Sequence, residues 1–310
     1  MRALVTGATG FIGYQLVKQL VEQGHDVVVI SRNPDGARCR FARVLMEKGK
    51  ELLHFYGWDA MHGPPPSVAL EGVDAVVHLA GEPLAESRWS PERKRLIRES
   101  RALGTKNLVR GLAIAKPKVV VSASAIGFYG DRGDERLDEG SSAGAGFLSE
   151  VCRDWEREAL EAEKIEGTRV VRLRTGLVLG RTGGALPRIL PIFRWGAGGV
   201  LGSGNQWMSW IHECDLVSMI QWALAEHDLQ GAVNAVGPTP VTNREFTQAL
   251  AQALKRPALI PAPATALKFA LGEMSDVVLH SQRVLPKKAL ERGFQFQFQD
   301  FNGAIQDLLK

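Results

Sequence analysis

The sequence predicts an α/β fold in which helices cover both faces of a doubly wound parallel sheet. Two observations predict it. Short β-branched runs alternate with helical patterns through the first 180 residues, and a glycine-rich turn joins the first run to the first helix. The 310 residues are 45% hydrophobic and 23% charged, so the chain is globular and long enough to bury a large core.

Five nearly continuous apolar runs are the expected strands, at residues 3–5, 27–30, 75–79, 119–121 and 170–173. Continuous apolar character indicates burial on both faces, as in a parallel sheet. Between the first two runs, one helical face carries the apolar residues Phe11, Ile12, Leu16, Val17, Leu20 and Val21. Gly24 follows where that helix would end.

A further helix should begin after Ser90, with Pro91 in its first turn. The stretch from Arg88 to Arg110 holds eight Lys or Arg residues. Most of these belong on a solvated face, although one or two could reach a phosphate. After about residue 180 the chain turns to Gly- and Pro-rich loops with helices at 213–225 and 243–254. We therefore expect a sheet domain at 1–180 and mostly a smaller substrate lobe at 181–310.

Charge and cysteine content limit the function classes. Lysine plus arginine number 38 against 34 acidic residues, which suits an anionic small molecule but is too weak to indicate nucleic acid. Cys39, Cys152 and Cys214 are an odd number without C-x-x-C spacing, which disfavours disulfides or a metal site. With no run of eighteen apolar residues and no signal peptide, we expect a cytoplasmic protein without a membrane partner. The oligomeric state stays open.

The turn after the first strand reads Thr6-Gly7-Ala8-Thr9-Gly10-Phe11-Ile12-Gly13. Its first glycine permits a tight turn, and its second lets backbone amides approach a pyrophosphate. Its third lets helix and strand pack closely. Glycines can also merely mark a turn, but the strand before and the helix after them favour a dinucleotide site.

The second strand ends at Ser31-Arg32, where an acidic residue would bond the adenosine ribose of NAD. A hydroxyl and a guanidinium instead suit the 2′-phosphate of NADP(H). The plainer alternative is a surface arginine at a strand end. Asp59, further along the chain, could accept from the adenine amine or be an ordinary loop residue.

Several strings along the chain occur together in a known family. They include the glycine turn, His78-Leu79-Ala80-Gly81, Arg101-x-x-Gly104-Thr105-x-Asn107-Leu108, and Ser122-Ala123-Ser124 followed by Tyr129-Gly130. This set resembles the epimerase/dehydratase branch of the extended short-chain dehydrogenases/reductases. More specific strings, such as Gly202-Ser203-Gly204-x-Gln206-Trp207 and Gln282-Arg283-Val284-Leu285-Pro286, are similar to its atypical epimerase subgroup. The C-terminal segment of that subgroup, without an assigned role, would lie at about 255–305.

The resemblance implies a Rossmann sheet that binds NADP(H). The cofactor contacts it implies are Gly7, Thr9, Gly10, Phe11 and Ile12 at the pyrophosphate, Ser31 and Arg32 at the 2′-phosphate, Leu79 and Ala80 on the adenosine side, and Val178 at the nicotinamide. Arg101 stands where the extended pattern usually has Asn, and it could reach the cofactor from the basic helix.

The family's acid/base pair is the main departure. Extended reductases carry Tyr-x-x-x-Lys about 25 residues after the serine strand, and the lysine lowers the tyrosine pKa for proton transfer. The tyrosines here are residues 14, 56 and 129, and we expect none to have a lysine four residues later. The matching helix offers Phe147 and Val151, or Leu148 and Cys152. Ser124 remains to bond a substrate oxygen, and Tyr129 could donate a proton or simply pack.

Other side chains have both functional and structural interpretations. We interpret Glu82, His212 and Cys152 as structural, and Trp89, Trp207 and Trp210 as lining an apolar cleft or the core. Two function classes follow. The first is an NADP(H)-dependent oxidoreductase or nucleoside-diphosphate-sugar epimerase, with an altered acid/base set and an unidentified small-molecule substrate. The second is a non-catalytic NADP(H)-binding protein that senses redox state or binds a partner.

Overall fold

A seven-stranded parallel sheet forms the centre of the protein in the computed structural model, which describes residues 1–46 and 51–310. The strand order is β11-β7-β5-β4-β1-β2-β3. Their bounds are β1 Arg2–Thr6, β2 Asp26–Ser31, β3 Leu53–Gly57, β4 Ala75–His78, β5 Val119–Ala125, β7 Arg169–Thr175 and β11 Gly231–Ala235. All five predicted strands lie in this sheet, so the predicted fold class is confirmed.

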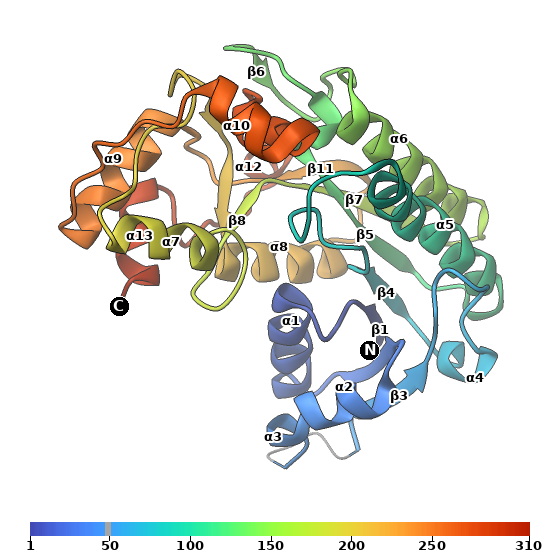
Figure 1. Cartoon of the computed structure of the whole chain (residues 1–310). Helices are drawn as coiled ribbons and strands as arrows, with labels where there is room; N and C mark the ends of the chain where they lie inside the picture. The colour runs from blue at the N-terminus through green and yellow to red at the C-terminus, as the bar shows by residue number, and fades with distance from the viewer. Residues whose placement is uncertain (47–50) are drawn as a thin grey trace.

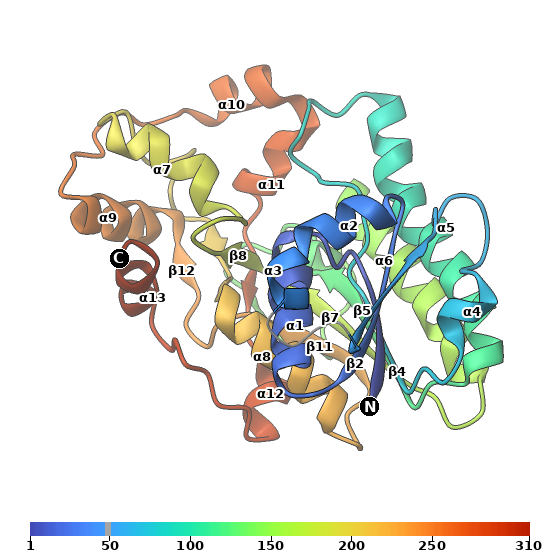
Figure 2. The same ribbon diagram turned by 90° about the horizontal axis from the view of Figure 1, so that it is seen from below.

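Helices cover both faces of the sheet (Figure 1, Figure 2). One face packs against α1 (Phe11–Glu22), α2 (Pro34–Arg40), α8 (Glu213–Ala225) and α12 (Lys287–Glu291). The other face packs against α4 (Ser67–Leu70), α5 (Pro91–Ala115) and α6 (Phe147–Leu160). The side chains of β5 alternate between the two layers, since Val119 and Val121 join the first cluster and Val120 joins the second. This double burial explains the continuous apolar runs.

The chain beyond residue 180 contributes to the sheet layer as well as to the smaller lobe. β11 pairs in parallel with β7, and α8 packs beside α1. The sequence pattern did not predict β11, because the run Gly231–Ala235 has only three apolar residues around an asparagine. α8 and α9 (Asn243–Leu254) have the bounds predicted for them. The division at residue 180 stays a prediction.

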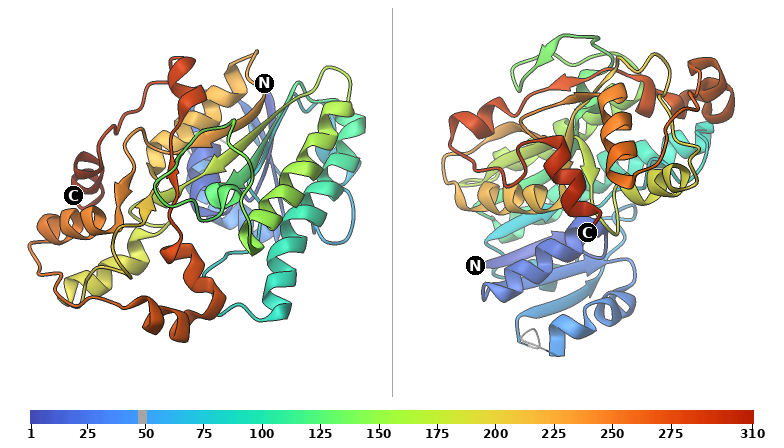
Figure 3. Two further views of the ribbon diagram at one scale, coloured as in Figure 1. Left: turned by 90° about the horizontal axis from the view of Figure 1, so that it is seen from above. Right: turned by 90° about the vertical axis from the view of Figure 1, so that its left-hand side faces the viewer.

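The smaller lobe has its own apolar cluster, built from α7 (Leu186–Arg194), α9 and α13 (Phe301–Leu308) around Trp210. Figure 3 shows these helices gathered to one side of the sheet. The remaining elements are α3 Ala42–Val44, η2 Ile126–Tyr129, β6 Arg136–Leu137, η3 Glu161–Lys164, β8 Leu177–Leu179, β9 Trp207–Met208, β10 Trp210–His212, β12 Val241–Thr242, α10 Ala264–Leu271, η4 Gly272–Ser275, α11 Asp276–Leu279 and β13 Arg283–Val284.

The 25-residue α5 begins as predicted. The hydroxyl of Ser90 accepts a hydrogen bond from the Arg93 backbone amide at 3.1 Å, and Pro91 occupies the first turn. Among the residues that the structure describes, no helix is both long and apolar enough to cross a membrane.

Candidate functional site

The turn from β1 to α1 packs directly on the end of β4. Gly7 has φ +66°, and a Cβ there would lie 2.7 Å from the Leu79 carbonyl carbon. A Cβ on Gly13 would overlap the carbonyl oxygen of Gly7. Both positions therefore require glycine, one for its backbone conformation and both for close packing. A Cβ on Gly10 would meet only that same oxygen, at 3.1 Å, so the space beside Gly10 is open.

Gly10 is also the N-cap of α1 and has no side chain with which to cap the first-turn amides. Phe11 and Ile12 begin the helix, so their N–H groups and the positive end of the helix dipole face the turn. Thr9 lies in the same turn. Uncapped amides beside open space at a helix N-terminus suit a phosphate group.

A series of buried hydrogen bonds holds the residues beneath this turn in place. The Thr6 hydroxyl accepts from the backbone amides of Leu79 and Ala80, at 3.2 and 3.1 Å, and lies 2.7 Å from Nδ1 of His78. Because its lone pairs are used, Thr6 donates its proton to Nδ1. Nε2 of His78 then carries the ring proton and donates to Thr105 of α5 at 3.0 Å. Burial lowers the pKa of His78 to about 4, so the imidazole is neutral.

Phe11 has a second contact that sequence reasoning missed. Its ring fills space left by the glycines of the loop after β8, because a Cβ at Gly180 or Gly183 would overlap it. The carboxylate of Glu213, at the start of α8, accepts from the Arg181 backbone amide in this loop at 3.0 Å and from the Gln15 side chain. The loop is thereby held against the N-terminus of α1. The glycines of the string Gly180-x-x-Gly183-Gly184 were the sequence feature that could have predicted this close contact.

Arg32 follows β2 and has an exposed side chain. Its Nη1 lies 3.4 Å from a carboxylate oxygen of Glu82, whose other oxygen is 3.4 Å from Nη1 of Arg93. Ser31 accepts from the Asn33 amide at 3.2 Å. Ser31 and Arg32 thus lie together at the strand end, as the sequence predicts.

Asp59 is engaged within its own loop. Its carboxylate accepts from the Met61 backbone amide at 3.0 Å and pairs with His62, and the Met61 hydrogen bond is the main cause of its lowered pKa. The adenine contact considered for Asp59 stays a prediction.

Val178 lies in β8, which pairs with β10 through Ile211. Leu79 and Ala80 follow β4 and receive the Thr6 contacts described above. Arg101 projects from α5, its guanidinium close to Gly81, at the turn after β4. The predicted cofactor contacts therefore surround the carboxyl ends of β1, β2 and β4 and the short strand β8.

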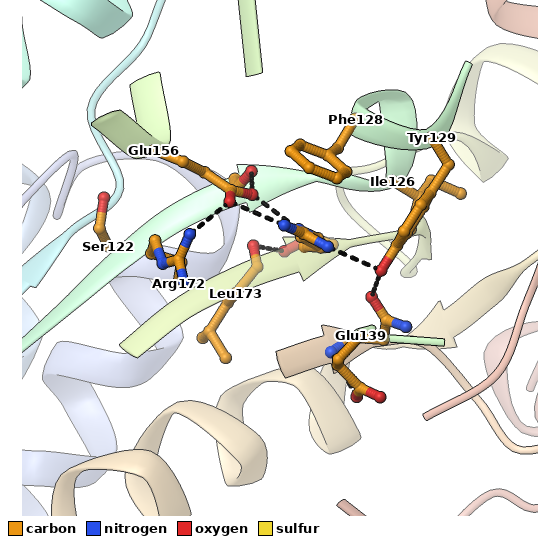
Figure 4. Close-up of polar contacts among 12 residues, drawn as sticks. Ser122, Ile126, Phe128, Tyr129, Glu139, Glu156, Arg172 and Leu173 are labelled. Carbon is orange, nitrogen blue, oxygen red and sulfur yellow. Dashed lines mark hydrogen bonds and ion pairs between the residues drawn. The ribbon is translucent and has the colours of Figure 1, made fainter. Parts of the chain in front are cut away.

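Ser124 lies at the end of β5, but its hydroxyl points to a carboxylate. It donates to Oε1 of Glu156 on α6 at 2.8 Å, and both side chains are buried (Figure 4). Glu156 also accepts from Arg174 at 2.7 and 2.9 Å and from Arg172 at 2.8 Å. Parallel pairing of β5 with β7 sets Arg174 beside Ser124 and Arg172 beside Ser122. Sequence reasoning missed this cluster, although two arginines alternating along a buried strand were a signal.

Tyr129 belongs to the same polar network. Its hydroxyl donates to Oδ1 of Asn234 at 2.6 Å and accepts from Arg174 at 3.0 Å (Figure 4). The side chain is fully buried, and burial raises the pKa of its hydroxyl. The guanidinium of Arg174 also lies 3.5 Å from the centre of the Phe128 ring. These contacts favour the packing interpretation of Tyr129.

Leu148 and Cys152 of α6 face the end of β5. A Cβ on Gly127 would lie 3.3 Å from Leu148 and 3.7 Å from the Cys152 sulfur. Burial raises the pKa of Cys152 to about 12, so it is a neutral thiol. Phe147 and Val151 pack with Trp89 in a separate apolar cluster. None of these four side chains can perform tyrosine or lysine chemistry.

The expectation that no tyrosine has a lysine four residues later is wrong at one position, because Tyr14 and Lys18 have this spacing. Both lie on α1, across the sheet from α6. Tyr14 stacks on Phe41 at 5.0 Å, and Lys18 pairs with Glu22 at 3.7 Å. They are packing and surface residues, and α6, the helix that matches the family pattern, has no such pair.

The remaining sequence candidates have structural contacts. His212 caps α8 by accepting from the Cys214 amide at 3.1 Å and stacks on Phe298 at 3.8 Å, and burial lowers its pKa. Trp210 is fully buried in the smaller lobe. Trp89 donates to the Leu84 carbonyl, and Trp207 donates to Asp134 under the guanidinium of Arg283.

A surface cavity of about 620 Å³ opens elsewhere, on the outer side of α9. Arg244, Lys255 and Arg256 are among the residues that line it, and none of the residues above does. It is separate from the glycine turn.

Comparison with known proteins decides the family. The model of the NAD dependent epimerase/dehydratase family matches residues 3–237, and that of a domain of unknown function, DUF1731, matches 262–308. The chain belongs to the NAD dependent epimerase/dehydratase family. The predicted resemblance is therefore confirmed, and the predicted C-terminal segment at 255–305 overlaps the second match.

Relatives in this family span the whole chain. The chloroplastic homologue of epimerase family protein SDR39U1 from Arabidopsis thaliana is 41% identical over 314 residues, covering 100% of this chain and 87% of the relative. Epimerase family protein YfhF from Bacillus subtilis is 35% identical, covering 100% and 98%. A crystal structure of human epimerase family protein SDR39U1 with NADPH has a TM-score of 0.82 and 33% identity, covering 99% of each chain.

Proposed function

We propose that this epimerase-family protein binds NADP(H) and uses it for hydride transfer with a small molecule, as an oxidoreductase or a nucleoside-diphosphate-sugar epimerase. The observation that carries the choice of NADP(H) is Arg32 beside Ser31 at the end of β2, where an acidic residue would favour NAD. A human relative solved with NADPH supports the same choice.

The residues present fit such a cofactor. Uncapped amides of Phe11 and Ile12 beside the open space at Gly10 would bind the pyrophosphate, with Gly7 and Thr9 shaping the turn. Ser31 and Arg32 would bind the 2′-phosphate, Leu79 and Ala80 would border the adenosine side, and Val178 would border the nicotinamide. The cofactor would supply or accept the hydride, while this chain must handle the proton.

Few side-chain protons are available for transfer at the substrate end of the site. Ser124 donates its proton to Glu156, so its oxygen can accept a hydrogen bond from a substrate hydroxyl without rearrangement. The Tyr129 proton is used on Asn234, and the raised pKa of Tyr129 keeps it protonated near neutral pH. Ser124 is therefore the stronger candidate for a substrate contact, and Tyr129 for a supporting role. This arrangement suits an alcohol substrate better than an unactivated ketone.

The same scarcity of available protons supports a second candidate function, a non-catalytic NADP(H)-binding protein. Leu148 and Cys152 occupy the helix face that should carry the tyrosine and lysine, and both hydroxyl protons are used within the protein. Such a protein would sense redox state or present a partner surface. We place either protein in the cytoplasm, since Cys39, Cys152 and Cys214 are free thiols.

A substrate screen separates the two functions. Alcohols, carbonyls and nucleotide sugars are offered with NADP⁺ or NADPH, and cofactor absorbance is followed. Turnover that Ser124→Ala abolishes and Ser122→Ala leaves intact supports the enzyme, because Ser122 lies on the same face of β5 but donates to a backbone carbonyl. Tight NADPH binding without turnover of any compound supports the non-catalytic function.

A further inference from the structure

We infer that Arg101 takes the place of the missing lysine and binds the nicotinamide-ribose half of the cofactor, an inference that rests on the proposed NADP(H) function. In the Tyr-x-x-x-Lys arrangement the lysine follows the tyrosine by one helical turn. In α6 that turn runs from Leu148 to Cys152, and the same face continues to Glu156. Cys152 contributes a neutral thiol, so α6 supplies no cation at this position and a cation there would come from another element.

Arg101 brings a guanidinium to this location from the neighbouring helix. α5 and α6 pack side by side (Figure 1). The Arg101 guanidinium lies 5.2 Å from the centre of the Trp155 ring on α6 and interacts electrostatically with Cys152. The guanidinium also lies beside Gly81, where an added Cβ would be in ordinary van der Waals contact with the guanidinium carbon, at 3.4 Å. Arg101 therefore joins the Cys152 position to the turn after β4, which borders the dinucleotide site.

The hydrogen-bonding capacity of Arg101 is largely unused in the described structure. Its one hydrogen bond to protein there is from Nη1 to the Ile97 carbonyl in its own helix, at 3.1 Å. The carboxylate of Glu82 attracts Arg101, but its two oxygens lie 3.4 Å from Arg32 and Arg93. Burial lowers the pKa of Arg101, which expresses the cost of desolvating a cation without a bonded carboxylate.

Its neighbours on α5 differ in this respect. Arg98, one turn earlier, bonds Asp154 through Nε at 2.7 Å, and Arg93 pairs with Glu82 and Glu86. A partly buried guanidinium beside the turn after β4, with most of its N–H groups unused within the described structure, suits vicinal hydroxyls such as those of a ribose. A purely structural alternative is stacking on Trp155, which would stabilise α5 against α6 whether or not a nicotinamide is bound.

Two ligands distinguish these roles. NADPH carries both halves of the dinucleotide, whereas 2′,5′-ADP carries only the adenosine half with its 2′-phosphate. Calorimetry measures both against the unmodified chain, Arg101→Met, Arg101→Lys and the control Arg98→Met. We expect Arg101→Met to weaken NADPH roughly tenfold to a hundredfold, with 2′,5′-ADP binding unchanged. Arg101→Lys should recover part of the loss, and Arg98→Met should bind both ligands normally.

Other outcomes are equally decisive. Equal weakening of both ligands by Arg101→Met would assign Arg101 to packing, and unchanged NADPH affinity in Arg101→Met would also overturn the inference. If Arg101→Met fails to fold, Arg101→Lys decides alone: weakened NADPH with normal 2′,5′-ADP supports the inference, and any other pattern contradicts it. Failure of the unmodified chain to bind NADPH would instead refute the proposed function itself.

Discussion

The Thr6 hydroxyl lies 2.7 Å from Nδ1 of His78, and this buried contact joins β1 to β4 beneath the glycine turn. The same hydroxyl holds the amides of Leu79 and Ala80, and the far side of the His78 ring reaches Thr105 on α5. The donors of Thr6, His78, Leu79 and Ala80 all have acceptors in this hydrogen-bond network only when the imidazole is neutral with its proton on Nε2. The candidate cofactor site is therefore built on an uncharged histidine.

The neutral His78 gives a prediction for how the stability of the fold depends on pH. His78 titrates at about 4 in the folded chain but near 6.5 when unfolded. Between these values the unfolded state binds more protons, so stability is complete above about pH 6.5 and falls as pH drops toward 4. The contribution is about 3 kcal/mol in total, of which about 2 kcal/mol should be lost by pH 5. Chemical unfolding at neutral pH and at about pH 5 measures it.

The controls for this loss are His78→Gln and His62→Gln. His62 has an 81% exposed side chain on a loop. His78→Gln should be less stable at neutral pH and should show a smaller acid-dependent loss, whereas His62→Gln should keep the full loss. An unchanged pH dependence in folded His78→Gln would show that other groups cause it.

The glycine turn gives a second prediction. Gly10→Val should fold, because a Cβ there meets only the Gly7 oxygen at 3.1 Å, but its side chain should fill the space for the pyrophosphate. Gly13→Val should fail to fold, since its Cβ would overlap the Gly7 carbonyl. Circular dichroism and NADPH titration measure the two effects. A folded Gly10→Val chain with undiminished affinity would place the cofactor elsewhere.

The sequence predicted the glycine turn, the five strands it named and helices α8 and α9 because each is local. A turn, an apolar run or a helical repeat is written in consecutive residues. The Glu156 cluster is not local, since it needs the register of β5 against β7 and the rotation of α6. Pairing of Phe11 with the loop at Gly180 needs segments 169 residues apart in sequence (180 − 11). β11 was missed because its asparagine, bonded to Tyr129, interrupts the apolar run.

The Glu156 cluster gives a stability prediction. Glu156→Gln leaves Arg172 and Arg174 without their common carboxylate in a buried site, which should cost roughly 3–5 kcal/mol of unfolding free energy. Glu161→Gln is the matched control, because Glu161 pairs with Lys164 at the surface and should cost less than about 1 kcal/mol. Denaturant titration measures both. Similar small losses in the two variants would mean that the cluster is not essential to the fold.

The absent tyrosine and lysine predict weak carbonyl reduction. Loss of a positioned acid typically costs about 10²–10⁴ in rate, so simple ketones should show little NADPH oxidation even at saturating cofactor. Absorbance assays over a carbonyl panel measure it. Brisk reduction that persists in Ser124→Ala and Tyr129→Phe would require a proton donor other than these two residues, and the account of the altered site would be wrong.

The most direct test of the NADP(H) assignment is calorimetric titration of NADPH and NADH into the unmodified chain and into Arg32→Ala. A charge-assisted hydrogen bond contributes roughly 1.5–3 kcal/mol, so Arg32→Ala should weaken NADPH about tenfold to a hundredfold and leave NADH nearly unchanged. Arg38→Ala is the control, since that guanidinium lies over the Phe55 ring. The account predicts tighter NADPH than NADH binding and loss of this preference with Arg32; equal affinities in the unmodified chain would contradict it.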